Sequence, residues 1–153
     1  MSYEEKAREY FMEGCNCSQA AFCAFCDLTG MEKSVALRLS SSFGGGMGRL
    51  REVCGALSGI FMAAGILYGY EDLEDKSLKT AHYERIQELA ARFKEENGSL
   101  LCREILGLAE THSQPEPSDR TEAYYASRPC ARIVASAARI LEEYIKEHPL
   151  SEG

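Results

Sequence analysis

The chain has 153 residues, of which 45% are hydrophobic and 27% charged, and its formal net charge is −7 at pH 7. This length and composition predict a single domain over residues 1–153, with a core large enough to fold without a disulfide or metal staple. The acidic residues are spread along the chain and no stretch is polybasic, so nucleic acid is not an expected partner. The N-terminus lacks the basic and apolar parts of a secretory signal, which favours a cytoplasmic location.

The first third of the chain carries the start and stop signals of three helices. Ser2 with Glu5 is a capping-box pair, Asn16 is a suitable N-cap, and Gly30 is a suitable helix end. Helices are therefore predicted over residues 2–12, 16–30 and 32–41. The glycine-rich run Gly44–Gly48 that follows is expected to be a flexible loop whose bend brings Cys54 into position.

The fourth predicted helix, residues 51–68, is the most apolar. Val53 to Tyr70 is a run of 18 residues without a charge, which is the length at which a membrane span begins to be considered. The other helices are amphipathic and need an apolar partner, so we expect a central core helix rather than a membrane span. Its two small-residue pairs, Gly55-x-x-x-Gly59 and Gly65-x-x-x-Gly69, are expected to face neighbouring helices at close approach.

Three further helices are predicted over residues 75–96, 99–108 and 128–147. The first of them carries an apolar face formed by Leu78, Tyr83, Ile86, Leu89 and Phe93. Thr111 to Ala126 contains Pro115 and Pro117 and is predicted to be one long loop or lid. No segment shows the alternation of a half-buried strand, so the predicted fold is all-α: a compact bundle of six or seven helices around the apolar helix.

Four of the seven cysteines fall at the predicted starts of four different helices. They are Cys17, Cys54, Cys102 and Cys130. The positive end of the helix dipole and the unpaired N–H groups at a helix start both stabilise a thiolate. Arginines lie close in sequence to three of them: Arg51 before Cys54, Arg103 beside Cys102, and Arg128 and Arg132 on either side of Cys130. These four sulfurs are the candidate catalytic or metal-binding residues, and we expect them to form one cluster.

The other three cysteines differ from these four. Cys23-x-x-Cys26 is a C-x-x-C motif, but it is predicted to lie inside the second helix, where the two side chains share a face and core packing is the favoured role. No histidine follows Cys26, which excludes attachment of a c-type haem through this motif. Cys15 is a candidate auxiliary thiol.

The cysteine pattern resembles the C_GCAxxG_C_C family of redox-active proteins. The residues that carry the resemblance are Cys17, the run Cys54-Gly55-Ala56-Leu57-Ser58-Gly59, Cys102 and Cys130, with flanks Asn16 to Ala20, Phe43 to Gly48 and Arg128-Pro129. The resemblance covers about residues 9 to 145 and implies a compact helical domain with four functional cysteines. The family is also similar to a region of split-Soret cytochromes, which implies an iron–sulfur centre as one candidate cofactor.

Three interpretations of the function remain open. The four cysteines could exchange electrons as thiols and disulfides with a redox partner that the sequence does not identify. They could instead be ligands of an iron–sulfur cluster or of zinc, although the ligand spacings are long. Alternatively, the chain is a helical binding module, monomeric or homo-oligomeric, whose cysteines only pack. For thiol chemistry we expect Cys54 to be among the most acidic thiols if its site is open, and Cys23 and Cys26 to stay near or above the usual pKa.

Overall fold

The computed structural model describes residues 1–108 and 113–151, and this part of the chain is helical without any strand. The all-α fold class is therefore confirmed. The α-helices are α1 (Tyr3–Met12), α2 (Cys17–Cys23), α3 (Cys26–Thr29), α4 (Lys33–Ser40), α5 (Gly44–Met47), α6 (Gly55–Tyr68), α7 (Lys76–Asn97), α8 (Cys102–Ile105), α9 (Glu122–Ser127) and α10 (Cys130–Glu147). A short 3₁₀ turn, Ser41–Phe43, joins α4 to α5.

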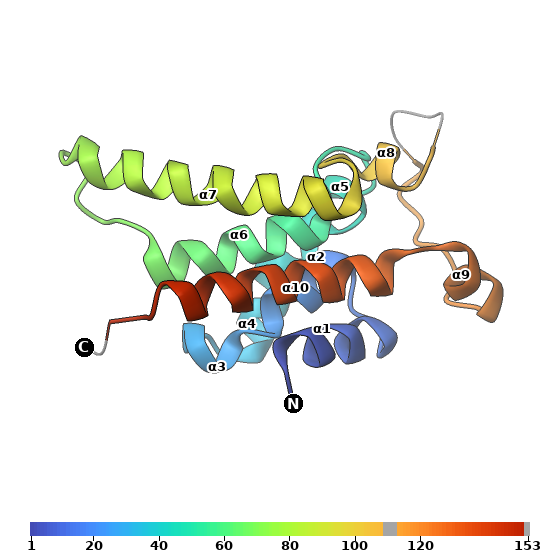
Figure 1. Ribbon diagram of the computed structural model, residues 1–153. Helices are drawn as coiled ribbons and strands as arrows, with labels where there is room; N and C mark the ends of the chain where they lie inside the picture. The colour runs from blue at the N-terminus through green and yellow to red at the C-terminus, as the bar shows by residue number, and fades with distance from the viewer. Residues whose placement is uncertain (109–112, 152–153) are drawn as a thin grey trace.

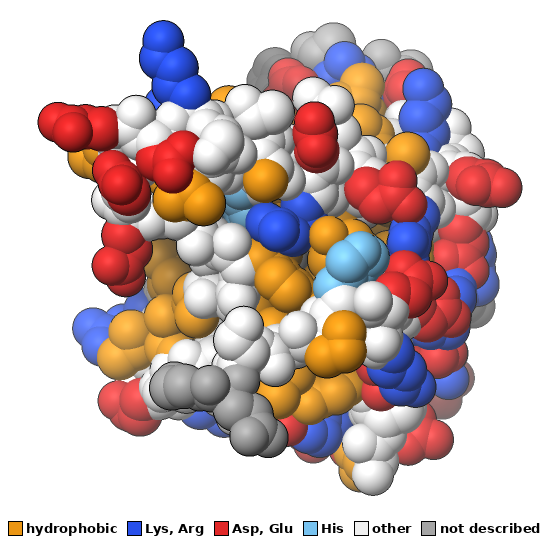
Figure 2. Space-filling model, turned by 60° about the vertical axis from the view of Figure 1, so that its left-hand side comes forward, with side chains coloured by type: hydrophobic (Ala, Val, Ile, Leu, Met, Phe, Trp, Pro, Cys, Tyr) orange, Lys and Arg blue, Asp and Glu red, His pale blue; other side chains and the backbone are white. Residues whose placement is uncertain are grey.

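The apolar helix α6 lies at the centre, as its composition predicts. It packs against α2, α10 and α7, while α1 covers α2 and α10 (Figure 1). The fully buried large side chains come from several of these helices: Phe11, Phe22, Phe25, Leu57, Ile60, Leu89, Phe93, Val134 and Leu141. None of the described helices is both long enough and apolar enough to cross a membrane. On the face shown in Figure 2, many Asp and Glu side chains lie at the surface, in keeping with the negative net charge.

Only the first of the two small-residue pairs in α6 serves close helix packing. A Cβ atom on Gly55 would lie 3.2 Å from the backbone nitrogen of Ser18, and one on Gly59 would lie 2.7 Å from the Ser18 carbonyl oxygen. Helix α2 therefore rests directly on the backbone of α6. Gly65 has no neighbouring atom within 4 Å of the corresponding position, and Ile66 is 44% exposed. The expectation that the second pair, Gly65 and Gly69, faces another helix is wrong, because this end of α6 has reached the surface.

The predicted second helix is two helices. Helix α2 ends at Cys23, and a turn at Ala24 and Phe25 separates it from α3. The turn places Phe25 in the core, where its ring stacks on Tyr3 with the ring centres 4.5 Å apart. The C-x-x-C motif therefore spans this break, with Cys26 as the first residue of α3, and does not lie inside one helix.

Other element boundaries also differ from the predicted ones. The fourth helix begins at Gly55 instead of residue 51, so Val53 and Cys54 are extended backbone ahead of it. The predicted loop Thr111–Ala126 contains α9 in its second half, capped by Thr121, and its residues 111 and 112 lie outside the described part of the chain. On α7, Leu89 and Phe93 are buried as predicted, but Leu78 and Tyr83 are exposed because the start of this helix extends past the core.

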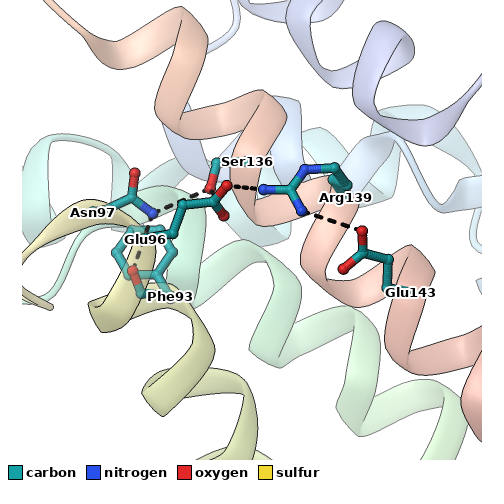
Figure 3. Close-up of polar contacts among 6 residues, drawn as sticks. All are labelled: Phe93, Glu96, Asn97, Ser136, Arg139 and Glu143. Carbon is teal, nitrogen blue, oxygen red and sulfur yellow. Dashed lines mark hydrogen bonds and ion pairs between the residues drawn. The ribbon is translucent and has the colours of Figure 1, made fainter.

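A polar network joins α7 to α10 (Figure 3). The Ser136 hydroxyl donates to Glu96 Oε2 at 2.6 Å, and Asn97 Nδ2 donates to the same hydroxyl oxygen at 3.2 Å. Arg139 forms an ion pair with Glu96 and another with Glu143. The buried serine therefore links two side chains of α7 to the middle of α10.

Replacing Ser136 with alanine is expected to lower the free energy of unfolding by about 1–2 kcal/mol, because the partly buried Asn97 loses an acceptor and Glu96 a donor. Urea unfolding measures the change. The matched control is S34A, which also removes a serine hydroxyl that donates to a glutamate, Glu32, but at an exposed position. Equal effects of the two substitutions would show that the α7–α10 network contributes no more than a surface hydrogen bond.

Candidate redox site

The four predicted site cysteines line one cavity of about 320 Å³. Each stands at a helix start, as predicted: Cys17, Cys102 and Cys130 are the first residues of α2, α8 and α10, and Cys54 is the N-cap of α6. Helices α5, α8 and α9 lie at the end of the molecule where α10 begins (Figure 1). The fold thus gathers residues that are more than a hundred positions apart in sequence.

Cys17 reaches the cavity through the close packing of α2 on α6. Asn16 caps α2, with its side chain accepting from the backbone N–H of Gln19 while the Gln19 side chain accepts from the N–H of Asn16. Gly55 and Gly59 lie against Ser18, the residue after Cys17. The start of α2 is therefore held beside the start of α6, and Cys17 beside the segment that carries Cys54.

Cys54 and Cys102 are brought together by backbone pairing. Residues 51–54 run antiparallel to residues 100–103, with a bridge between Val53 and Leu101. The Cys54 N–H donates to the Leu100 carbonyl at 2.8 Å, and the Cys102 N–H donates to the Glu52 carbonyl at 2.6 Å. These main-chain bonds fix the separation of the two backbone segments that carry the cysteines.

The glycine run before Cys54 is a tight left-handed turn and not the flexible loop that the sequence suggested. Gly45, Gly46 and Gly48 have φ angles of 70°, 70° and 62°. A Cβ atom on Gly46 would lie 2.6 Å from Cβ of Cys102 and 2.8 Å from the backbone nitrogen of Glu52. Glycine is needed here because the φ angle is positive and because any side chain would collide with Cys102 and Glu52. Cys102 therefore packs directly against the turn.

Cys17 and Cys130 are neighbouring thiols at the cavity wall, close enough for each to shift the pKa of the other. Their interaction raises the pKa of Cys17 well above its usual value and, as the largest effect, lowers that of Cys130. Burial of Cys130 opposes the lowering, and the guanidinium groups of Arg128, Arg120 and Arg51 add to it. The resulting pKa of Cys130 is about 7, which makes it the thiol best prepared to act as a nucleophile near neutral pH.

Cys54 is not among the acidic thiols. Burial raises its pKa to about 12, although the backbone N–H groups of Ala56 and Leu57 at the start of α6 act in the opposite direction. Desolvation therefore outweighs the helix start, which is the outcome expected for a sealed site. The low pKa expected for Cys54 in an open site is not found, and the thiol with a lowered pKa is Cys130.

Of the arginines that lie close to the cysteines in sequence, Arg128 acts on Cys130 as predicted, but the other three do not follow the prediction. Arg51 is buried, and the hydrogen bond that its Nη1 donates goes to Cys102 Sγ, 3.4 Å away, and not to Cys54. Arg103 is held in an ion pair with Glu52, and Arg132 is exposed and outside the cavity lining. Arg120 lines the cavity and acts on Cys130, but its sequence position among loop residues gave no signal of this.

The segment after residue 112 covers part of the cavity. Pro115, Pro117 and Ser118 line it, and the Ser113 N–H donates to the Arg49 carbonyl oxygen at 2.7 Å. Arg51 Nε also donates to the Ser113 hydroxyl at 2.9 Å. The described part of the predicted lid is thus tied to the residues that precede Cys54.

The model of one protein family matches residues 15–144, which is most of the chain and includes all four cavity cysteines. That family is described as "Putative redox-active protein (C_GCAxxG_C_C)". The chain belongs to this family. No curated protein and no solved structure matches the chain. The resemblance predicted from the four cysteines and the CGAxxG run is therefore confirmed.

Three cysteines of this family member lie outside the cavity lining: Cys15, Cys23 and Cys26. Burial is the largest effect on each and raises the pKa of all three, that of Cys23 to about 12. The prediction that Cys23 and Cys26 stay near or above the usual pKa is confirmed. These three thiols are less suited to nucleophilic chemistry than Cys130 is.

Four cysteine thiolates are ligands that zinc and iron–sulfur clusters accept, but in the described part of the chain they are not grouped as a metal centre. Within residues 1–108 and 113–151, no three or more His, Cys, Asp or Glu side chains are grouped so that they could hold a metal ion. The described cysteines, Cys17, Cys54, Cys102 and Cys130 included, are free thiols, and one of the four, Cys102, is engaged by Arg51. The four thiols share a cavity, and no chemical step is assigned to a metal.

Proposed function

We propose that this protein carries out thiol–disulfide exchange, with Cys130 as the attacking thiol and Cys17 as the resolving thiol. The observation that supports the proposal best is that these two thiols line one cavity at neighbouring helix starts, close enough to shift each other's pKa. A resolving thiol must reach the sulfur of the attacking one, and neighbouring thiols satisfy that requirement. Membership of a family described as redox-active agrees with this chemistry.

The exchange takes place in two displacement steps. The Cys130 thiolate attacks one sulfur of a disulfide substrate, forming a mixed disulfide and releasing the other half as a thiolate, which takes up a proton. Cys17 then loses its proton and attacks Cys130 Sγ, so that the second half leaves as a thiolate and a Cys17–Cys130 disulfide remains. The substrate gains two electrons and the protein loses two. An external dithiol returns these electrons and closes the cycle.

Cys54 and Cys102 form the second part of the proposed site. Backbone pairing holds them near each other, and both lie close enough to Cys17 to influence the pKa of its thiol. In the proposal they are a reserve dithiol: a thiolate of this pair attacks the Cys17–Cys130 disulfide and forms a mixed disulfide, releasing one of those two sulfurs as a thiolate that takes up a proton. The other thiol of the pair then loses its proton and attacks the mixed disulfide, displacing the remaining sulfur of the Cys17–Cys130 pair and leaving a Cys54–Cys102 disulfide. The four cysteines hold four transferable electrons when all are reduced, and they give them up when both pairs are oxidised to disulfides.

Trapping of the mixed disulfide tests the assignment. Reduced C17S, mixed with a small disulfide reagent, is expected to accumulate a Cys130 mixed disulfide, because the resolving thiol is missing. C130S is expected to form almost none at equal times, and C26S is the matched control, which should behave like the unaltered protein. Peptide mapping by mass spectrometry locates the adduct. An adduct on Cys54 or on Cys23 in place of Cys130 would contradict the proposed order of attack.

Metal analysis separates this proposal from the iron–sulfur and zinc alternatives. Protein purified without oxygen is expected to be colourless and to contain less than one iron or zinc per four chains. All four cavity thiols should then react with a thiol-counting reagent after unfolding. A brown protein, or one zinc per chain removable only by a chelator, would replace thiol exchange with a metal-bound function for the same cysteines.

A further inference from the structure

The cysteine cavity is basic although the chain as a whole is acidic. Four arginines line it, Arg49, Arg51, Arg120 and Arg128, and its described lining includes no Asp or Glu side chain. The full chain has 24 acidic and 17 basic residues, so its net charge is negative, opposite to that of the cavity lining. A basic cavity in an acidic protein is a place where anions concentrate, because the field inside a partly enclosed site is poorly screened.

Arg51 has a buried donor group without a partner. Its side chain is 3% exposed; Nε donates to Ser113 Oγ, and Nη1 donates to Cys102 Sγ. Nη2 is buried and has no hydrogen-bond partner among the described residues. Leaving a charged donor buried and unpaired is costly, so such a group in a cavity wall indicates a ligand that accepts its hydrogen bond.

Arg120 adds positive charge to the cavity, while two of its nitrogens donate to backbone carbonyl oxygens. Its Nη1 donates to the Phe11 carbonyl oxygen and its Nη2 to the Cys15 carbonyl oxygen, both at 3.0 Å. The guanidinium group also lies 4.2 Å from the centre of the Phe11 ring and 5.2 Å from that of Tyr124. These contacts hold the charge in a fixed place, so Arg120 attracts an anion at a distance while Arg51 supplies the hydrogen bond.

We infer that the cavity binds a small molecule that carries an oxyanion group, a carboxylate or a sulfonate, with Arg51 Nη2 as its donor. A cavity of about 320 Å³ is at the lower end of the range for small-molecule sites. Since Arg51 Nη1 also contacts Cys102, the anion would lie next to the cysteine cluster. Resting on the proposed function, the substrate would then be a small disulfide or thiol with a negatively charged group, and the anion would place its sulfur near Cys130.

Binding of a redox-inert anion tests the inference without any thiol chemistry. Isothermal titration of the reduced protein with ethanesulfonate is expected to show one site, whereas the neutral ethyl methyl sulfone, of similar size, is expected to show none. R51M should weaken sulfonate binding about tenfold or more, since it removes a charged donor. The matched control R132M removes an equal but exposed charge and should leave the binding unchanged.

Two further measurements keep the inference falsifiable if R51M does not fold. R51K retains the positive charge on a shorter donor and is expected to bind sulfonate with intermediate affinity, and circular dichroism shows which variants are folded. The comparison of sulfonate with sulfone on the unaltered protein needs no variant at all. Equal binding of the two probes, or no binding of sulfonate at millimolar concentration and low salt, would overturn the inference.

Substrate selectivity is measured separately from binding. Oxidation by bis(2-sulfonatoethyl) disulfide is expected to be at least tenfold faster than oxidation by bis(2-hydroxyethyl) disulfide, and R51M should lose this preference. If sulfonate binds but neither disulfide oxidises Cys17 and Cys130, the proposed function fails and the anion site stands. If both disulfides react at equal rates and sulfonate does not bind, the anion site fails and thiol exchange stands.

Discussion

Replacing Gly59 with alanine is expected to lower the free energy of unfolding by about 1–3 kcal/mol, the usual cost of overpacking a well-packed core. The added methyl carbon would lie 2.7 Å from the Ser18 carbonyl oxygen and 2.9 Å from Cβ of Ala21. Both atoms belong to helix α2, so neither can move without displacing the helix that carries Cys17. Denaturant unfolding followed by circular dichroism gives the change.

Gly65 is the matched control on the same helix. Apart from the adjacent residues and the backbone of α6 itself, no atom of the described residues lies within 4 Å of the position that a Cβ on Gly65 would occupy. Because alanine restricts the unfolded chain and favours helix, G65A is expected to raise the free energy of unfolding by about 0.5–1 kcal/mol. Equal shifts of the same sign for G59A and G65A would show that α2 does not rest on the α6 backbone as described.

Cys130 is expected to be alkylated at least about a hundredfold faster than Cys54 at pH 7. With a pKa of about 7, half of the Cys130 thiols are thiolates at that pH, while a pKa of about 12 leaves on the order of 10⁻⁵ of the Cys54 thiols ionised. The greater intrinsic nucleophilicity of the more basic thiolate offsets part of this difference. Iodoacetamide is a suitable reagent because it carries no charge that the basic cavity could attract or repel.

The pH dependence of the Cys130 rate follows from the direction of its pKa shift. Since the pKa is lowered, the rate should rise as the pH increases towards 7 and level off above it, where the thiolate fraction is complete. In C17A the interaction of Cys17 with Cys130 is lost, whereas serine would keep a hydroxyl donor, so the midpoint should move to higher pH in C17A. Mass spectrometry of quenched samples reads each cysteine separately. A faster reaction at Cys54 or Cys23, or an unchanged midpoint in C17A, would contradict the pair.

Local sequence signals predicted most of the helices because each signal acts within a few residues. The capping boxes at Ser2 and Asn16 begin α1 and α2, the Asp75 side chain caps α7, and Gly30 and Gly98 end helices in the left-handed conformation. The same signals placed four cysteines at helix starts. Their presence in one cavity agrees with that pattern, although their catalytic and metal-binding roles remain predictions.

Features that depend on distant parts of the chain could not be predicted. The break after Cys23 allows Phe25 to stack on Tyr3, a residue from another helix. The high pKa of Cys54 depends on how completely other segments cover it, and the charge of Arg120 reaches Cys130 only through the folded loop. The two glycine pairs of α6 look alike in sequence, and only the position of α2 makes one of them a contact surface.

Residues 51–54 pair with residues 100–103 through main-chain hydrogen bonds. The number of residues in these two segments, and not the identity of their side chains, therefore sets the distance between Cys54 and Cys102. Serine at either position would keep both main-chain hydrogen bonds and leave the other cysteine in its place. An inserted residue next to Val53 would act differently, since successive side chains in extended backbone point to opposite sides and a shift by one turns Cys54 away. Substitution of Val53 should therefore be tolerated better than an insertion or deletion beside it, while Arg51, Cys54 and Cys102 are restricted by the roles proposed for them.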